Sequence, residues 1–526
     1  MFSLKRLPAY FVLIWIIQIC VILFSSCKEY HRNKSHANIS LRSIEKGEVL
    51  AKKYCSSCHS LPNPAWLDAA TWEKGVLPTM GPYLGIFEHM FQDYKSSRND
   101  MNLEKNIYPN QPIISAIQWQ NIIDYYTATS PDKLGGQNRE QEIQMGLPLF
   151  TVQMPAVSYT NATTSFLSIN PNNISYPLVL SDAIRKTTYF FNKDLSVVDS
   201  FTTSGPTVGI EFNPNGFLTC NIGILNPNNG KFGKGQFIKK EDGKYKESSE
   251  VIMDSLRRPV QFSSADLNGD GKIDYLVCEF GFVVGSLSWM EHTNKGFKRH
   301  ILRDLPGAIK AYIDDYNNDG LPDIWVLFAQ GEEGIFLYTN NGNGKFKESK
   351  VLSFPSVYGS SFFELVDFNK DGLKDIVYTC GDNADFSPVL KPFHGVYIFI
   401  NKGDNKFEQT FFFPINGCYK ALARDFDNDG DLDIATISYF ADYKNQPEES
   451  FVYLKNEGSN KFKPFSFPES SLGRWLTMDA GDIDGDGWLD IVLGNFFMGP
   501  SIIKSNVDWS LSPPFIVLKN TGKNVQ

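Results

Sequence analysis

The segment DIDGDGWLD, residues 482–490, belongs to a pattern that occurs five times in the C-terminal half of the chain. The other copies are DLNGDGKID (266–274), DYNNDGLPD (315–323), DFNKDGLKD (367–375) and DFDNDGDLD (425–433). Successive copies begin 49, 52, 58 and 57 residues apart. A period of about 50 residues with one loop in each repeat is typical of a propeller or a similar repeat array.

The residue types of this nine-residue loop suit a hard cation. Side-chain oxygens stand at positions 1, 3, 5 and 9, a glycine stands at position 6, and position 7 offers its carbonyl. Calcium takes six to eight oxygen ligands and therefore fits the loop best. One copy alone would indicate a polar turn, whereas five copies in register predict metal binding. The predicted ligands, for up to five calcium ions, are Asp266, Asn268, Asp270, Lys272, Asp274, Asp315, Asn317, Asp319, Leu321, Asp323, Asp367, Asn369, Asp371, Leu373, Asp375, Asp425, Asp427, Asp429, Asp431, Asp433, Asp482, Asp484, Asp486, Trp488 and Asp490.

The residues around each loop predict strands. No Glu stands at position 12 as in an EF-hand, and the loops are followed by short apolar runs such as IWVLFA (324–329). An N-x-G turn also recurs between strands, as in FLYTNNGNGKFKE (336–348). These repeats resemble the calcium-loop repeats of integrin-type β-propellers, the FG-GAP or VCBS class, over residues 146–526. Each blade is predicted to run loop, strand, strand, turn, strand.

The predicted propeller has seven blades. The segment GFLTCNIG (216–223) aligns with DYLVCEFG (274–281), which indicates a blade that keeps its strands without a metal loop. The segment SYPLVLSDAIRKTTYFFNKD (175–194) predicts a further strand pair upstream. Because the last repeat ends early, LFTVQMPAV (149–157) is expected to complete it and remove the open sheet edge.

The N-terminus has the pattern of a secretory signal. Residues 1–26 contain Lys5 and Arg6, an apolar run and small residues before Cys27. The segment resembles a bacterial lipoprotein signal, which implies lipidation at Cys27 and a polar tether at residues 27–42. The alternative is an uncleaved membrane anchor. Under the lipoprotein interpretation the chain is exported and anchored to the outer membrane of a Gram-negative bacterium, where it faces the periplasm or the surface. Lys28-Glu29 faintly resembles the export signals of surface lipoproteins in Bacteroidota.

The pentapeptide CSSCH (55–59) has the spacing of covalent haem c attachment, in which two thiols bind the vinyl groups and the histidine binds iron. Alone it also suits a redox or zinc site. It follows a helical pattern, IEKGEVLAKKY (44–54), and a second amphipathic pattern lies at SAIQWQNIIDYY (115–126), with apolar residues at helical spacing. The sequence therefore predicts two helices on either side of a long loop.

Residues 43–133 resemble a small class I cytochrome c domain with one covalent haem c. The resemblance implies that Cys55 and Cys58 form the thioethers, that His59 is one axial ligand and that Met80 is the other. Met80 lies in a Pro/Gly-rich loop, WEKGVLPTMGPYLG, about twenty residues after the haem motif. His89, Met90 and Met101 remain alternative sixth ligands.

The expected architecture is a small all-α cytochrome c-like domain, a linker at residues 134–145 and an all-β propeller with calcium loops at residues 146–526. The net charge of −9 is no evidence for a cationic partner, because the acidic excess lies in the metal loops. Four later cysteines are expected to be small buried thiols: Cys220, Cys278, Cys380 and Cys418.

Three functions fit this architecture. The first is a membrane-anchored electron-transfer lipoprotein whose propeller docks a partner or ligand. The second is an enzyme whose propeller oxidises a sugar or alcohol and passes electrons to the haem; no catalytic residue is assigned, because His292, His300 and His394 are scattered. The third is an adhesion or glycan-binding module. The expected partners are a redox protein or a small-molecule or glycan ligand, and the membrane through the N-terminal lipid, with no nucleic acid.

Overall fold

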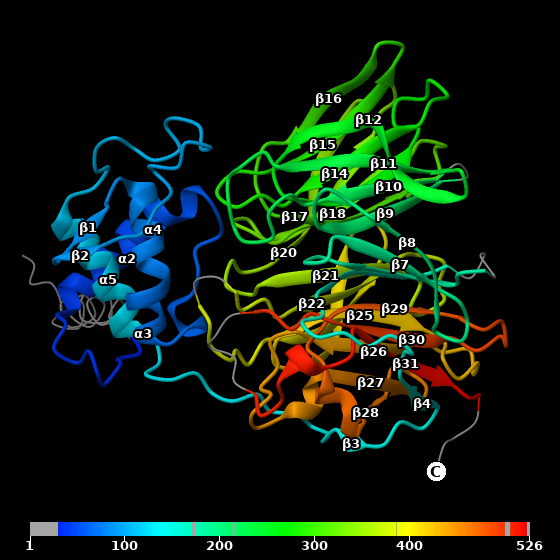
Figure 1. The fold of residues 1–526 in the computed structure, drawn as a ribbon. Coiled ribbons are helices and arrows are strands. Elements are labelled where there is room, and N and C mark those ends of the chain that lie inside the picture. Colours follow the sequence, from blue (N-terminus) through cyan, green and yellow to red (C-terminus); the bar gives the residue numbers. More distant parts are fainter. Residues whose placement is uncertain (1–29, 171–174, 214–215, 385–386, 500–504, 523–526) are drawn as a thin grey trace, which may run out of the picture.

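A computed structural model describes residues 30–170, 175–213, 216–384, 387–499 and 505–522. A helical region, blue in Figure 1, stands beside a large β-sheet region that runs from cyan to red. Within the described residues, the β-sheet region contains seven sheets of four or five strands. The predicted signal and the lipidation site Cys27 lie outside the described residues. No helix in the described part of the chain is both long and apolar enough to cross a membrane.

The seven sheets are the blades of a β-propeller, numbered here one to seven in chain order. Each of the first six blades takes four consecutive strands, beginning with β5. Blades one to four contain β5 Thr164–Ile169, β6 Leu178–Asp182, β7 Thr187–Phe191, β8 Val197–Thr202, β9 Thr207–Asn213, β10 Gly216–Asn221, β11 Gly233–Glu241, β12 Lys244–Leu256, β13 Pro259–Ala265, β14 Asp274–Glu279, β15 Ser286–Thr293, β16 Gly296–Arg303, β17 Ala308–Asp314, β18 Asp323–Phe328, β19 Gly334–Asn340 and β20 Phe346–Ser353. Blades five to seven contain β21 Ser360–Val366, β22 Asp375–Cys380, β23 Gly395–Asn401, β24 Phe407–Pro414, β25 Cys418–Arg424, β26 Asp433–Ser438, β27 Phe451–Asn456, β28 Phe462–Ser466, β29 Trp475–Gly481, β30 Asp490–Asn495 and β31 Phe515–Asn520. Short 3-10 helices lie in blades six and seven: η5 Pro447–Ser450, η6 Pro468–Leu472 and η7 Trp509–Leu511.

The first strand of each blade is innermost. These first strands contact one another in a closed ring, in the order β5, β9, β13, β17, β21, β25, β29 and back to β5. Each blade was predicted to contain a loop followed by three strands. This prediction is wrong, because each blade has at least four strands, and the first of them precedes the loop. The inner strands escaped prediction because polar residues interrupt them, as in AIKAYID of β17. The second strands, such as DIWVLF of β18, are buried throughout and read as continuous apolar runs.

The ring closes as the sequence predicted. The strand β4, Phe150–Gln153, pairs antiparallel with β31 as the outer strand of blade seven. In Figure 1 the cyan strand β4 lies beside the red and orange strands at the C-terminal end of the chain. A short strand β3, Gln144–Met145, pairs parallel with β28 of blade six. The seven-bladed prediction is confirmed, and blade seven combines strands from both ends of the propeller sequence.

The helical region is organised around two helices of 14 residues, α2 Leu41–Tyr54 and α5 Ala116–Thr129. They cross in close contact, because a Cβ on Gly47 would lie 1.8 Å from the carbonyl oxygen of Asn121. Trp119 and Ile122 of α5 are buried against Ile44 of α2 in one apolar cluster. The remaining elements are η1 Cys55–Ser57, η2 Pro64–Trp66, α3 Ala69–Thr71, the π-helical turn η3 Trp72–Val76, α4 Leu77–Met80, η4 Gly81–Leu84, β1 Glu88–His89 and β2 Gln92–Asp93.

The prediction that this region is entirely helical is wrong, because β1 and β2 form a small hairpin. Met90 and Phe91 make the two-residue turn, with φ of 49° and 65°. A turn with two positive φ angles matches the twist of a hairpin but is normally built from Asn or Gly. Neither Met90 nor Phe91 therefore predicts a turn at this position.

Polar contacts fix the helical region to the propeller. The Arg257 guanidinium of the propeller donates to the carbonyl of Asn102 (3.2 Å) and forms an ion pair with Glu104. In the segment that connects the helical region to the propeller, the side chain of Gln137 donates to the carbonyl of His394 (2.9 Å). Arg139 donates to the carbonyl of Pro414 (2.9 Å) and pairs with the buried Glu449. The segment predicted as a linker is therefore bonded to the propeller surface.

Candidate metal and haem sites

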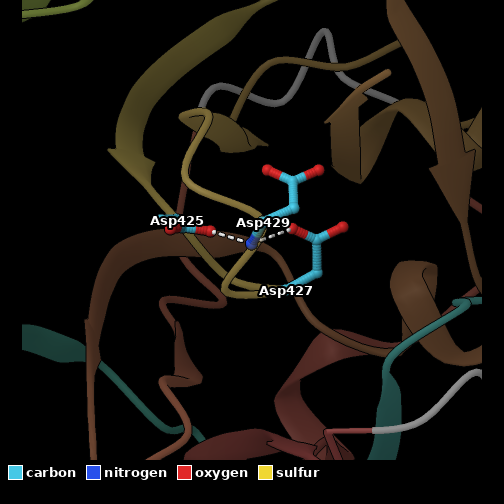
Figure 2. A group of neighbouring side chains, drawn as sticks. All are labelled: Asp425, Asp427 and Asp429. Atoms are coloured by element: carbon cyan, nitrogen blue, oxygen red, sulfur yellow. Dashed lines mark hydrogen bonds between the residues drawn. The ribbon is translucent and has the colours of Figure 1, made fainter. Parts of the chain in front are cut away.

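Each repeated loop joins the first strand of a blade to the second. In blade six, the backbone N–H of Asp429 donates to Oδ1 of Asp425 (3.1 Å) and to Oδ1 of Asp427 (3.3 Å), as Figure 2 shows. The N–H of Gly430 donates to Oδ2 of Asp425 (2.9 Å), and its φ of 96° favours glycine. The loop is thus folded around its own first carboxylate. The same bond from position 6 to position 1 recurs at Asp266, Asp315, Asp367 and Asp482.

The structure brings several predicted ligands together. Carboxylate oxygens of Asp425, Asp427 and Asp429 lie within 4.8 Å of one another. The same holds for Asp482, Asp484 and Asp490 in blade seven. The other three loops carry an amide at position 3, namely Asn268, Asn317 and Asn369. The N–H at position 7 donates to the carboxylate at position 5 in every loop, from Lys272 to Asp270, Leu321 to Asp319, Leu373 to Asp371, Asp431 to Asp429 and Trp488 to Asp486.

The carboxylate at position 9 is buried and accepts a hydrogen bond that the sequence did not predict. Asp433 accepts the backbone N–H of Asn456 at 2.7 Å, and Asn456 is the asparagine of the N-x-G turn. The amide of Asn456 also donates to the carbonyl of Leu432 (3.1 Å) in the loop. The turn asparagine therefore ties the third strand to the metal loop. Three other blades repeat this bond, from Asn340 to Asp323, Asn401 to Asp375 and Asn520 to Asp490.

Burial shifts the titration of these position 9 carboxylates. Burial raises the pKa of Asp433 to about 7 and that of Asp490 to about 6. Burial also raises the pKa of Asp274, Asp323 and Asp375. Oδ2 of Asp323 has no hydrogen-bond partner among the described residues. A bound cation would offset the cost of this unpaired oxygen, whereas the equivalent oxygens of Asp274, Asp375 and Asp490 accept backbone N–H groups within their loops. The fit to calcium therefore rests on the oxygen-rich donor set, which is of the kind that calcium prefers.

Lysine side chains form ion pairs with the loop carboxylates of blades six and seven. The Lys455 ammonium lies 2.7 Å from Asp427, and Lys519 lies 3.0 Å from Asp486 and also contacts Asp484. Both lysines precede the turn asparagine in the third strand of their blade. Their positive charges partly neutralise the loop.

The CSSCH segment follows the last turn of α2. Cys55 is half-buried against the apolar cluster of the helical region, and burial, aided by the neighbouring Cys58, raises the pKa of its thiol to about 11. Cys58 is exposed, and no disulfide joins the two thiols. Both are therefore free thiols three residues apart at a helix end. The later cysteines Cys220, Cys278, Cys380 and Cys418 are also free and buried, which confirms the expectation for them.

The predicted axial ligands have different surroundings. Nδ1 of His59 lies 2.9 Å from the carbonyl oxygen of Ser60. Because a carbonyl only accepts, Nδ1 must carry the proton, which leaves the lone pair on Nε2. Met80, at the end of α4, packs on the same apolar cluster as Cys55. Among the alternative ligands, Nε2 of His89 bonds Gln120, while the side chains of Met90 and Met101 point to solvent, 77% and 99% exposed.

Aromatic residues join the helical region to blade five near the CSSCH segment. The Trp66 ring lies edge-on to Tyr358 with centroids 6.3 Å apart, and Tyr358 stacks on Phe393 at 4.6 Å. These propeller rings belong to the apolar cluster that contains Cys55 and Met80. The two parts of the chain therefore share a packed interface at this point.

The fully buried His394 next to this interface makes stability depend on pH. Burial, and then the charge of Lys391, lowers the pKa of His394 well below 6.5. The unfolded chain binds a proton at this histidine below about pH 6.5 whereas the folded chain does not, so stability is lost as pH falls. We expect His394 to contribute a loss of about 2 kcal/mol between pH 7 and pH 5, measured by urea unfolding as the difference in pH dependence between the wild type and His394→Leu. The difference is needed because buried carboxylates such as Asp433, with its raised pKa, change stability in the opposite direction over this range. His292→Leu is the control, and equal pH dependence of the two variants would contradict the assignment.

Comparisons with known proteins agree with the repeat pattern. The family model for the FG-GAP-like repeat matches residues 315–378 and 425–493. Mouse cartilage acidic protein 1 is 29% identical over 178 residues, which is 32% of this chain and 26% of that protein. The T-cell immunomodulatory protein homolog of Plasmodium falciparum is 24% identical over 243 residues, which is 35% of this chain and 33% of that protein. The chain thus spans about a quarter to a third of the length of these relatives.

Two solved structures are similar to this chain at TM-scores below 0.5. The WD40 domain of Neurospora crassa Pan2 has a TM-score of 0.41 at 12% identity, covering 73% of this chain and 99% of that chain. Saccharomyces cerevisiae Sqt1 has a TM-score of 0.41 at 9% identity, covering 71% of this chain and 98% of that chain. From its sheet order and repeat matches, the chain carries FG-GAP-like repeats within a seven-bladed β-propeller.

Proposed function

We propose that the chain is a membrane-anchored c-type cytochrome lipoprotein that transfers electrons at the cell envelope. Residues 43–133 would hold one covalent haem, and the propeller would dock a redox partner. The observation that carries this proposal is that Cys55 of the C-x-x-C-H motif and Met80 pack on one apolar cluster. A thiol and a thioether at one apolar surface, with a histidine next to the second thiol, are the ligand types that haem c needs.

The residues present fit that group. Cys55 and Cys58 are free to form two thioethers, and the contact from His59 Nδ1 to the Ser60 carbonyl leaves Nε2 to bind iron. A hydrogen bond made by the other ring nitrogen usually orients a metal-binding histidine. Haem bound through histidine and methionine supplies one-electron chemistry at a raised potential. The apolar residues around Cys55 and Met80 would exclude water from it.

The absorption spectrum tests the haem proposal. After expression with haem c maturation enzymes, the protein is expected to keep its haem through acid-acetone extraction and to show a c-type spectrum that changes on reduction. Cys55→Ala combined with Cys58→Ala should abolish covalent haem completely, whereas Cys220→Ala, a buried propeller cysteine, should leave it intact. Met80→Ala should remove the weak far-red band of methionine-ligated ferric haem. Wild-type protein without covalent haem would overturn the proposal.

We further propose that the five repeated loops bind calcium and stiffen the propeller. Calcium that binds only the folded loops stabilises them by mass action, by about 2.7 kcal/mol for a site at one hundred times its Kd. We expect a higher melting temperature in 2 mM calcium than in a chelator, measured by differential scanning calorimetry. Magnesium at the same concentration is the control and should have less effect, because it prefers smaller octahedral sites. Equal melting temperatures would contradict calcium binding.

A second candidate is a binding module in which the haem is accessory. The observation that favours it is the match of the repeats to a T-cell immunomodulatory protein homolog and to cartilage acidic protein 1, whose names carry no redox function. Binding to immobilised glycans or to an envelope protein should then survive Cys55→Ala combined with Cys58→Ala. Loss of binding together with the haem would favour the electron-transfer proposal.

A further inference from the structure

Two lysine side chains converge at the axis of the propeller. Lys310 and Lys420 are the third residues of the inner strands β17 and β25, and Phe362 is the third residue of β21 between them. The ammonium nitrogens of Lys310 and Lys420 lie 5.8 Å and 5.1 Å from the centroid of the Phe362 ring. Two positive charges therefore lie close to one aromatic ring.

Among the described residues, polar partners are found for Lys420 but not for Lys310. Lys420 donates to the carbonyl of Met478 (2.7 Å), the fourth residue of the next inner strand. The equivalent carbonyl beside Lys310 belongs to Phe363 and is taken by the Tyr312 hydroxyl at 3.1 Å. No hydrogen bond or ion pair joins Lys310 to any residue in the described part of the chain. Burial, and then the charge of Lys420, lowers the pKa of Lys310 to about 8.

The nearby acidic groups are already engaged. Glu364 forms an ion pair with Arg424 at 2.7 Å, and the carboxylate of Asp479 accepts the backbone N–H of Ile169 at 2.8 Å. The inner strands therefore carry three cations, Lys310, Lys420 and Arg424. They also carry three carboxylates at one shared strand position, because Glu211 of β9 stands at the same position as Glu364 and Asp479. All three carboxylates are bonded to groups other than Lys310, and that of Glu211 accepts the Ser264 hydroxyl. An unpaired ammonium in a half-buried position is unfavourable, so an additional anion would be stabilised there.

We infer that Lys310 and Lys420 form a binding site at the propeller axis for the carboxylate or phosphate group of a small ligand. The Lys310 ammonium supplies donors that no described residue uses, and Lys420 adds a second positive charge. The Phe362 ring, and that of Tyr312 at 4.7 Å from the Lys310 ammonium, offer apolar surface to the carbon skeleton of the ligand. The site is distinct from the calcium loops and from the haem region, so it goes beyond the proposed function.

Titration calorimetry on the full chain tests the site, with methyl phosphate and succinate as probes at low ionic strength. At least one probe is expected to bind with one-to-one stoichiometry, and the probe that binds distinguishes a phosphate from a carboxylate ligand. Lys310→Met should weaken this binding at least tenfold, whereas Lys310→Arg should retain it. Lys347→Met, an exposed lysine on the outer strand β20, is the matched control and should bind like the wild type. Failure of both probes to bind, or unchanged binding by Lys310→Met, would overturn the inference.

Thermal melting gives a second readout. Without added anions, Lys310→Met should melt at a higher temperature than the wild type, because it removes an unpaired, repelled charge. Methyl phosphate or succinate should raise the melting temperature of the wild type and leave that of Lys310→Met unchanged. Should Lys310→Met fail to fold, Lys420→Met takes its place with the same tenfold loss expected. A probe that stabilises wild type and variant equally would also overturn the inference.

Discussion

The Phe150→Ala variant is expected to lose about 4 kcal/mol of unfolding free energy. Phe150 begins β4, which completes blade seven, and its side chain is only 3% exposed. The ring lies edge-on to Phe426 and Tyr453, with centroids 5.7 Å and 5.4 Å apart. Because these residues belong to blade six, truncation leaves a cavity between the two blades at the closure of the ring. Urea unfolding followed by tryptophan fluorescence measures the loss.

The matched control is Thr151→Ala in the same strand. Thr151 is exposed and faces Lys519 across the strand pair, so its replacement should change the unfolding free energy by less than about 0.5 kcal/mol. Phe150→Ala should also expose the edge of β31 and increase aggregation at the melting temperature, because an unpaired strand edge can pair with another chain. Equal stability of the two variants would mean that β4 is not needed to hold the ring closed.

The features that the sequence predicted correctly have local physical signatures. The loops carry oxygen side chains and glycine at fixed positions, and the second and third strands form apolar runs, so the blades could be counted. Closure by β4 followed from the incomplete last repeat, because an open edge would be unfavourable. The helices α2 and α5 were predicted from apolar spacing, and Trp119 and Ile122 are buried as that spacing requires.

The features that escaped prediction depend on contacts between distant residues. The inner strands face the axis, where half-buried polar residues such as Lys310 interrupt the apolar pattern. The Met90-Phe91 turn uses positive φ angles without Asn or Gly. The bonds of Gln137 and Arg139 to the propeller involve partners more than 250 residues away, which no local pattern reveals.

The turn asparagine makes hydrogen bonds that its motif alone does not predict. The N-x-G pattern predicted a turn between strands, since glycine supplies the positive φ that the turn needs. The structure adds that the asparagine side chain accepts the glycine N–H and donates to the loop carbonyl, as Asn340 does with Gly342 and Pro322. Its backbone N–H also bonds the buried aspartate of the loop. In blades four to seven the two recurring motifs are therefore one bonded unit.

Breaking that unit is the second large effect that we expect: Asp433→Ala should destabilise the propeller by roughly 3 kcal/mol. Asp433 is buried and accepts the Asn456 backbone N–H at 2.7 Å and the Tyr453 hydroxyl at 2.6 Å. Without the carboxylate both donors stay buried and unpaired, which costs about 1–3 kcal/mol for each. Urea unfolding again measures the change.

Asp431→Ala is the matched control, because Asp431 occupies position 7 of the same loop and its side chain forms an exposed ion pair with Lys370 at 2.9 Å. Exposed ion pairs contribute about 0–1 kcal/mol, so this variant should be close to wild type. Both variants should be measured with calcium and with a chelator. The loss in Asp433→Ala should persist in the chelator, because its unpaired donors belong to the protein and not to the ion. If the loss disappears when calcium is removed, Asp433 acts only through the metal, and the hydrogen-bonded unit of loop and turn does not stabilise the blade by itself.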